Sequence, residues 1–244
     1  MKLKMNPVFR KDALAGSRGY SLPLMVTALN FLLVLLFLCN LFFVSSESAE
    51  TGEIAYTAFL RGCHIIAYAE LVLLLLAAPA LAAVSVLSER ENRTLPVLLT
   101  TTLRPSEIIL GKYLNCAVSV GTLMLGSFPV LAAGFLYGGI TVEETLFFLS
   151  GTVLLVLYAL AAGTAAACVF RSTAAVMTAA YSGIFLSFSA GALVYYMCEK
   201  SGNGLAYLHP AALSVLSVLT LLLIGLSIYR IGPVRPGRRA KDET

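Results

Sequence analysis

Long uninterrupted runs of apolar residues restrict what this chain can fold into more than any other feature. Residues 31–38, 71–83 and 219–226 are almost entirely apolar. Strands of a membrane barrel would instead alternate over about ten residues. Because backbone groups in lipid must be paired within their own segment, such runs predict membrane-spanning α-helices. The charged content of 12%, against about 25% in soluble domains, supports a protein whose solvent is the bilayer.

Six segments have the length of roughly 20 residues that a membrane crossing needs. We therefore expect an all-α integral membrane protein with a single domain over residues 1–244 and a six-span bundle over 22–230. The predicted spans are 22–44, 63–87, 113–137, 145–170, 174–198 and 210–230. A tight turn at Arg171-Ser172-Thr173 must separate the fourth and fifth spans, because one continuous helix would be too long for one crossing.

The positive charges predict the orientation of these spans. With the N-terminus inside, every Lys and Arg except Arg61 and Lys200 falls on the cytoplasmic side. This asymmetry in short loops predicts that both termini are cytoplasmic. The tail over residues 1–21 then forms either a short interfacial helix on the inner membrane surface or a solvated basic segment. Residues 231–244 form a basic cytoplasmic tail attracted to anionic lipid.

Small residues spaced four apart predict where helices approach one another, because close backbone contact is what joins helices in lipid. The repeats are Ala159, Gly163 and Ala167 in the fourth span, and Gly183, Ser187 and Gly191 in the fifth. Packing within the chain and a dimer interface are both open. Pro79 and Pro129 lie inside spans, where proline is expected to kink a helix.

Residues 88–112, SERENRTLPVLLTTTLRPSEIILGK, form the most polar long stretch in the middle of the chain. The orientation places them in the cytoplasm between spans two and three. A short helix is predicted from Ser88 to Leu99, and Pro105 and Glu107 suit the first turn of a second helix. Lys112 then lies at the lipid headgroups. The pattern predicts a charged docking surface with an apolar back, or a loop that is charged simply to stay inside.

A string of residues in this segment is similar to the signature of ABC-2 type transporter permeases. The string is Glu89-Arg90-Glu91-x-x-Thr94-Leu95-x-x-Leu98-Leu99-x-Thr101-x-Leu103, followed by Glu107-Ile108-x-x-Gly111-Lys112. Asn6-Pro7-Val8-Phe9-Arg10-Lys11 also resembles the interfacial helix that begins these permeases. In that family the stretch between spans two and three forms a cytoplasmic coupling helix, which joins the membrane subunit to its ATPase.

The resemblance implies the membrane subunit of an ATP-driven transporter, multi-pass in the bacterial inner membrane and in most relatives an exporter. Its partners would be a separate ABC ATPase, membrane lipid and a second permease copy or paralogue, with no nucleic acid. Gly111-Lys112 is followed by Tyr113 and lacks the remaining glycine of a phosphate-binding loop, so we expect the partner to bind ATP. We expect no catalytic residue, metal or cofactor in this chain.

The residues of the segment then receive expected roles in coupling. Charged contacts with the ATPase are expected from Glu89, Arg90 and Glu91. The residues expected to hold the coupling helix against the bundle are Thr94, Leu95 and Leu98. The residues expected to set the start of span three are Glu107, Gly111 and Lys112.

Glu70 is the one acidic residue well inside a span, where an unpaired charge would cost several kcal/mol. It lies on the transport pathway or makes a structural hydrogen bond to a Ser or Thr of another helix. The alternatives to an ATP-driven permease are an intramembrane enzyme and a secondary transporter. An intramembrane enzyme would need a catalytic set, yet no Asp lies in a predicted span. A secondary transporter often shows internal repeats, and none is convincing here.

Overall fold

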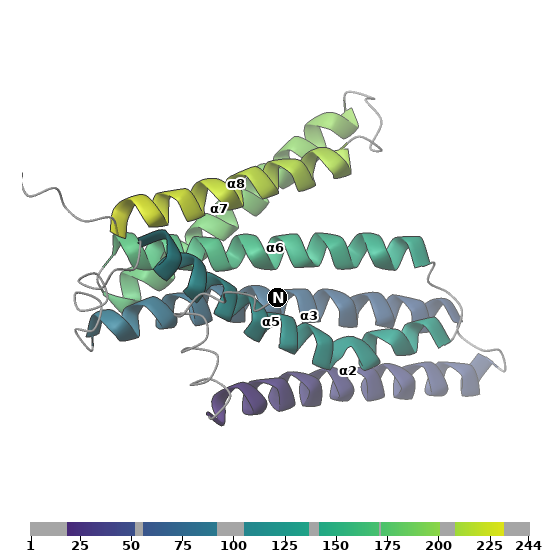
Figure 1. Ribbon diagram of the computed structural model, residues 1–244. Helices are drawn as coiled ribbons and strands as arrows, with labels where there is room; N and C mark the ends of the chain where they lie inside the picture. The colour runs from purple at the N-terminus through teal and green to yellow at the C-terminus, as the bar shows by residue number, and fades with distance from the viewer. Residues whose placement is uncertain are drawn as a thin grey trace, which may run out of the picture.

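The computed structural model describes residues 19–51, 56–91, 105–136, 142–170, 172–200 and 208–231. This part of the chain is all helical, with six α-helices and no strands (Figure 1). The helices are α2 (Ser21–Thr51), α3 (Tyr56–Glu91), α5 (Pro105–Leu136), α6 (Val142–Val169), α7 (Thr173–Lys200) and α8 (Leu208–Ile231). Each overlaps one predicted span, so the helical fold class is confirmed.

Five of these helices, α2, α3, α5, α6 and α7, are long and apolar enough to cross a membrane. In α8 the corresponding apolar stretch, Ser214–Arg230, is shorter. Many large apolar side chains face outward, including Phe31, Phe42, Phe43, Phe185 and Leu221. Such a surface would be unfavourable in water and suits contact with lipid, as expected of a multi-pass membrane protein.

Helices α3 and α6 form the centre of the bundle. Helix α3 contacts α2, α5, α6 and α7, while α6 contacts α3, α5, α7 and α8. In Figure 1, α2 lies at one edge of the molecule and α8 near the opposite edge. Leu74, Ala78 and Ala82 of α3 are fully buried in one cluster with Ala159 and Leu160 of α6. The mostly small side chains let the two central helices come close together.

The closest approach between α3 and α6 is at Pro79 and Gly163. A Cβ atom added to Gly163 would lie 2.5 Å from the Pro79 carbonyl oxygen and 2.8 Å from its Cα. Ala159 and Ala167, one turn to either side of Gly163, are fully buried. The predicted small-residue face of the fourth span is thus a packing face within the chain. Gly183 differs, because nothing lies within 4 Å of an added Cβ there.

The breaks between helices match the predictions in two places. Helix α6 ends at Val169 and α7 begins at Thr173, which confirms the tight break around Ser172. The Ala175 N–H donates to the Ser172 hydroxyl at 3.3 Å, which is how a serine caps the first turn of a helix. Helix α5 begins at Pro105 with Glu107 in its first turn, also as predicted.

The predicted start of a separate short helix at Ser88 is wrong. Helix α3 runs through Ser88 and ends at Glu91, so Ser88 continues this helix. Beyond the predicted end of the span at residue 87, Glu89 is buried and paired with Lys112 of α5, a contact that favours continuation of the helix. The remainder of the predicted short helix, 92–99, lies outside the described residues, as do residues 1–18 with the predicted interfacial helix and residues 232–244.

Three tyrosines join neighbouring helices through their hydroxyl groups. The Tyr113 hydroxyl of α5 donates to the Leu157 carbonyl of α6 at 2.9 Å. The Tyr181 hydroxyl of α7 donates to the Leu76 carbonyl of α3 at 2.6 Å. Between α6 and α7, the Tyr158 and Ser187 hydroxyl oxygens lie 2.5 Å apart. Each bond pairs a hydroxyl that lipid could not satisfy and links two helices around the centre.

We predict that Gly163→Ala destabilises the protein, because its methyl group would collide with the backbone of α3. Overpacking of this kind costs about 1–3 kcal/mol, or a fall in Tm of roughly 2–12 °C for a chain of this size. Thermal unfolding in detergent measures the effect. Gly183→Ala is the control and should leave Tm unchanged, since its site is open. Equal Tm values for both variants would contradict the close approach.

Candidate functional site

The candidate site lies where α3 ends and α5 begins. Glu89 lies in the last turn of α3, and Lys112 lies two turns into α5. Between the two helices, residues 92–104 fall outside the described part of the chain, and with them the predicted coupling residues Thr94, Leu95 and Leu98. Arg90 and Glu91 lie within α3, but their side chains are not described. Of the candidates between 88 and 112, this leaves Glu89, Glu107, Gly111 and Lys112 with described surroundings.

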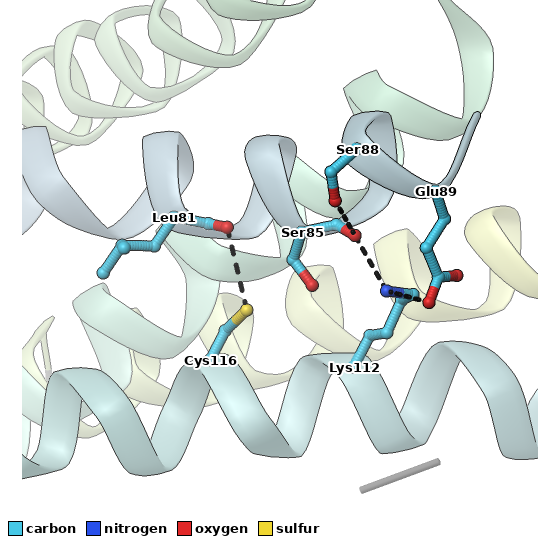
Figure 2. A network of polar contacts seen from close by, with 6 residues as sticks. All are labelled: Leu81, Ser85, Ser88, Glu89, Lys112 and Cys116. Carbon is cyan, nitrogen blue, oxygen red and sulfur yellow. Dashed lines mark hydrogen bonds and ion pairs between the residues drawn. The ribbon is translucent and has the colours of Figure 1, made fainter. Parts of the chain in front are cut away.

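Glu89 and Lys112 form a buried ion pair. The Lys112 Nζ atom lies 3.1 Å from the Glu89 Oε1 atom, and the two side chains are only 3% and 11% exposed, respectively. Figure 2 shows the lysine reaching from α5 towards the last turns of α3. Lys112 was predicted to lie at the lipid headgroups, but the structure buries it between helices. Opposite charges that leave water together stabilise one another only in good geometry with further hydrogen bonds.

Further polar contacts extend this pair along the two helices. The Lys112 ammonium also donates to the Ser85 carbonyl at 2.8 Å. One turn further into the bundle, the Cys116 thiol lies 3.8 Å from the Leu81 carbonyl. Leu81, Ser85 and Glu89 are spaced by four and share one face of α3, and Lys112 and Cys116 are likewise one turn apart on α5. The contacts therefore form a short antiparallel ladder between the two helices (Figure 2).

Apolar residues from three further helices surround this junction. Val86 and Leu87 of α3 belong to one buried cluster with Ala167 of α6 and Val176 of α7. Ile109 of α5 packs with Cys168 of α6 and Ile228 of α8. The ends of α3, α5, α6, α7 and α8 therefore pack together through residues that neighbour Glu89 and Lys112 in the sequence.

The other two described candidates on α5 have different surroundings. Glu107 is exposed in the first turn, whereas Gly111 is buried beside Lys112. Ile108 and Ile109 between them are almost completely buried. The start of α5 therefore presents one acidic side chain outward and packs its opposite face into the bundle. The role of Glu107, Gly111 and Lys112 in coupling stays a prediction.

Glu70 lies further along α3, towards the other end of the bundle. It is 3% exposed, and its Oε1 atom is hydrogen-bonded to the hydroxyl of the fully buried Ser127 of α5. The Ser127 hydroxyl also contacts the Met124 carbonyl at 2.9 Å. This is the kind of interhelical hydrogen bond that one of the two sequence interpretations expected. A role of Glu70 in transport stays a prediction.

A cavity of about 510 Å³ opens at this same end of the bundle. It is bounded by α3, α5 and α6, with Phe37 of α2 at its edge, and most of its lining is apolar. Tyr68 and Phe148 meet edge to face in its wall, with ring centroids 5.8 Å apart. The polar lining groups are Cys63, His64, Tyr68, Thr145 and Thr152. Sites for small molecules commonly combine an apolar wall with a few polar groups in this way.

Sequence reasoning missed both the pairing at the junction and the cavity. It assigned Glu89 and Lys112 separate roles, although both lie in the quoted motif. One feature of the sequence could have indicated the pair: an acidic and a basic residue lie at the two ends of one polar segment between apolar spans. The cavity residues come from separate helices, and no sequence spacing connects them. No family model matches the chain, and neither does any curated protein.

We predict that Ser127→Ala destabilises the protein because it leaves the buried Glu70 carboxyl without this partner. A buried polar group left unsatisfied costs about 1–3 kcal/mol. Ser119→Ala is a matched control on the same helix, since the Ser119 hydroxyl bonds to the Asn115 carbonyl one turn away in its own helix. Thermal unfolding in detergent should show a lower Tm for Ser127→Ala alone. A Tm equal to that of the control would show that the bond contributes nothing.

Proposed function

We propose that this chain is the permease subunit of an ABC-2 type transporter, driven by a separate ATPase that docks on residues 92–104 and the adjoining helix ends. The observation that best supports this is the pairing of Glu89 with Lys112, which belong to opposite ends of the family-like motif and form a buried ion pair. The pair fixes where the intervening segment leaves and rejoins the bundle. A docking element that must transmit force needs such anchored ends.

The membrane topology of this proposal has six crossings, with both termini and the docking segment in the cytoplasm. Six helices whose ends alternate along the bundle are compatible with it (Figure 1), and the distribution of Lys and Arg supports it. The protein would work in the bacterial inner membrane as a dimer with a second copy or a paralogue. Transport would be export, and ATP would be bound and hydrolysed on the partner.

The transport path in this proposal involves the end of the bundle opposite the docking segment. The cavity between α3, α5 and α6 supports this. These helices are three of the candidate spans, and the cavity between them has room for a small apolar group. Glu70 and Ser127 are the sequence neighbours of Leu71 and Phe128, which line the cavity. Their hydrogen bond would hold α3 and α5 together beside the path, and movement of these helices would alter its shape.

We predict that replacing residues 92–99 with a Gly/Ser linker of equal length abolishes binding of the ATPase. The permease should still fold, because Glu89, Lys112 and the helices around them remain unchanged. A fall in its Tm would report the loss of the contacts with the bundle that are expected of Thr94, Leu95 and Leu98. The test is co-purification in detergent after expression of the chain together with candidate ABC ATPases.

The matched control replaces residues 201–207 with a linker of the same composition, since the proposed topology places this segment on the opposite side of the membrane. This control should bind the ATPase as the unaltered chain does. If the 92–99 variant co-purifies with the ATPase as well as the control does, the segment is not the docking site.

A further inference from the structure

We propose that Glu89 and Lys112 are positioning residues, which join the cytoplasmic ends of α3 and α5 so that the two helices respond together when the docking segment moves. This inference rests on the proposed function. It reassigns Glu89, for which direct charged contact with the ATPase was expected. The reassignment follows from where its carboxylate lies and what that carboxylate contacts.

The burial of Glu89 favours a role within the chain. A residue that docks a partner presents its charge to the solvent, where the partner arrives. Glu89 is instead 8% exposed as a residue, and its carboxylate lies against the Lys112 ammonium at 3.1 Å. Turning Glu89 outward to meet an ATPase would leave the lysine charge buried without this partner, which is strongly destabilising. The pair is therefore better suited to act within the chain.

Lys112 contacts α3 at two points. It contacts the Glu89 carboxylate and also donates to the Ser85 carbonyl one turn earlier at 2.8 Å. The two contacts lie one turn apart on α3. They therefore restrain α5 from sliding along α3 and from moving away from it. The Cys116–Leu81 contact continues the alignment. The ladder in Figure 2 thus fixes the register of the two helices.

Apolar contacts connect this junction to the rest of the bundle. Ile109, three residues before Lys112, packs with Cys168 of α6 and Ile228 of α8. Val86, three residues before Glu89, packs in the cluster that includes Val176 of α7. A displacement applied to residues 92–104 would reach α3 and α5 at the ion pair. From there it would pass through these apolar contacts to three further helices.

Exchanging the charges separates positioning from direct contact. The variants are Glu89→Lys, Lys112→Glu and the double exchange, with the exposed Glu143→Lys and Arg230→Glu as controls of equal charge change. Two quantities are measured: the Tm of the permease alone, and the Kd of the ATPase well below every Tm. At that temperature a loss of stability alone would not weaken binding.

We predict that each single exchange lowers Tm by about 6–20 °C and weakens ATPase binding about tenfold or more. The double exchange should recover most of both losses, because the opposite charges again face each other between the helices. The contact with the Ser85 carbonyl is not restored, so recovery should be incomplete. The two controls should leave Tm and Kd unchanged.

Two results would overturn the inference. If the double exchange restored Tm but bound the ATPase as weakly as the single variants, one of the two residues would contact the ATPase directly. If neither single exchange lowered Tm, the pair would not join the helices. If the unaltered chain bound no ATPase while the Tm pattern held, the proposed function would fail and the join between α3 and α5 would stand.

A neutral pair keeps the test decisive if the single variants do not fold. Glu89→Gln combined with Lys112→Met removes both charges and leaves neither unpaired, a change that buried ion pairs often tolerate. Positioning predicts that this variant binds the ATPase more tightly than either single exchange, because no unpaired charge is left between the helix ends, and less tightly than the unaltered chain, because the contacts of Lys112 with α3 are lost. A direct charged contact predicts a loss of binding equal to that of Glu89→Lys.

Discussion

The backbone contact between α3 and α6 at Pro79 and Gly163 is the constraint on which the rest of the bundle depends. Lipid offers no hydrophobic drive for helices to associate, so they associate through close packing and a few polar bonds. The absent Cβ of Gly163 and the small side chains around it allow this contact. With α3 and α6 fixed at the centre, the faces that remain receive α2 and α5 on one side and α7 and α8 on the other.

Many polar side chains of the described helices are hydrogen-bonded within the protein, as hydrocarbon requires. Hydroxyls such as those of Thr152, Thr220 and Ser227 bond to carbonyls four residues earlier in their own helices. The costlier groups bond between helices, where Glu70 meets Ser127 and Glu89 meets Lys112. Both pairs join α3 to α5. These two helices are therefore joined by polar contacts both next to residues 92–104 and towards the cavity.

The sequence was sufficient to predict the helices, because apolar run length and lipid physics leave few alternatives. The break at Ser172, the start of α5 at Pro105 and the packing face around Gly163 were also predicted, since each depends on local residue chemistry. The continuation of α3 through Ser88 was not, because it goes with a tertiary contact, the pairing of the buried Glu89 with Lys112 of α5. The Glu89–Lys112 pair and the cavity depend on how distant segments pack together, and spacing along one chain does not encode that packing.

Docking of an ATPase on residues 92–104 is tested most directly by site-specific photo-crosslinking, with a photoreactive amino acid placed at Arg93 or at Gly204 in the intact permease–ATPase complex. Docking on this segment predicts crosslinks to the ATPase from position 93 and none from position 204. Crosslinks to the ATPase from position 204, or their absence at position 93 in an active complex, would contradict it.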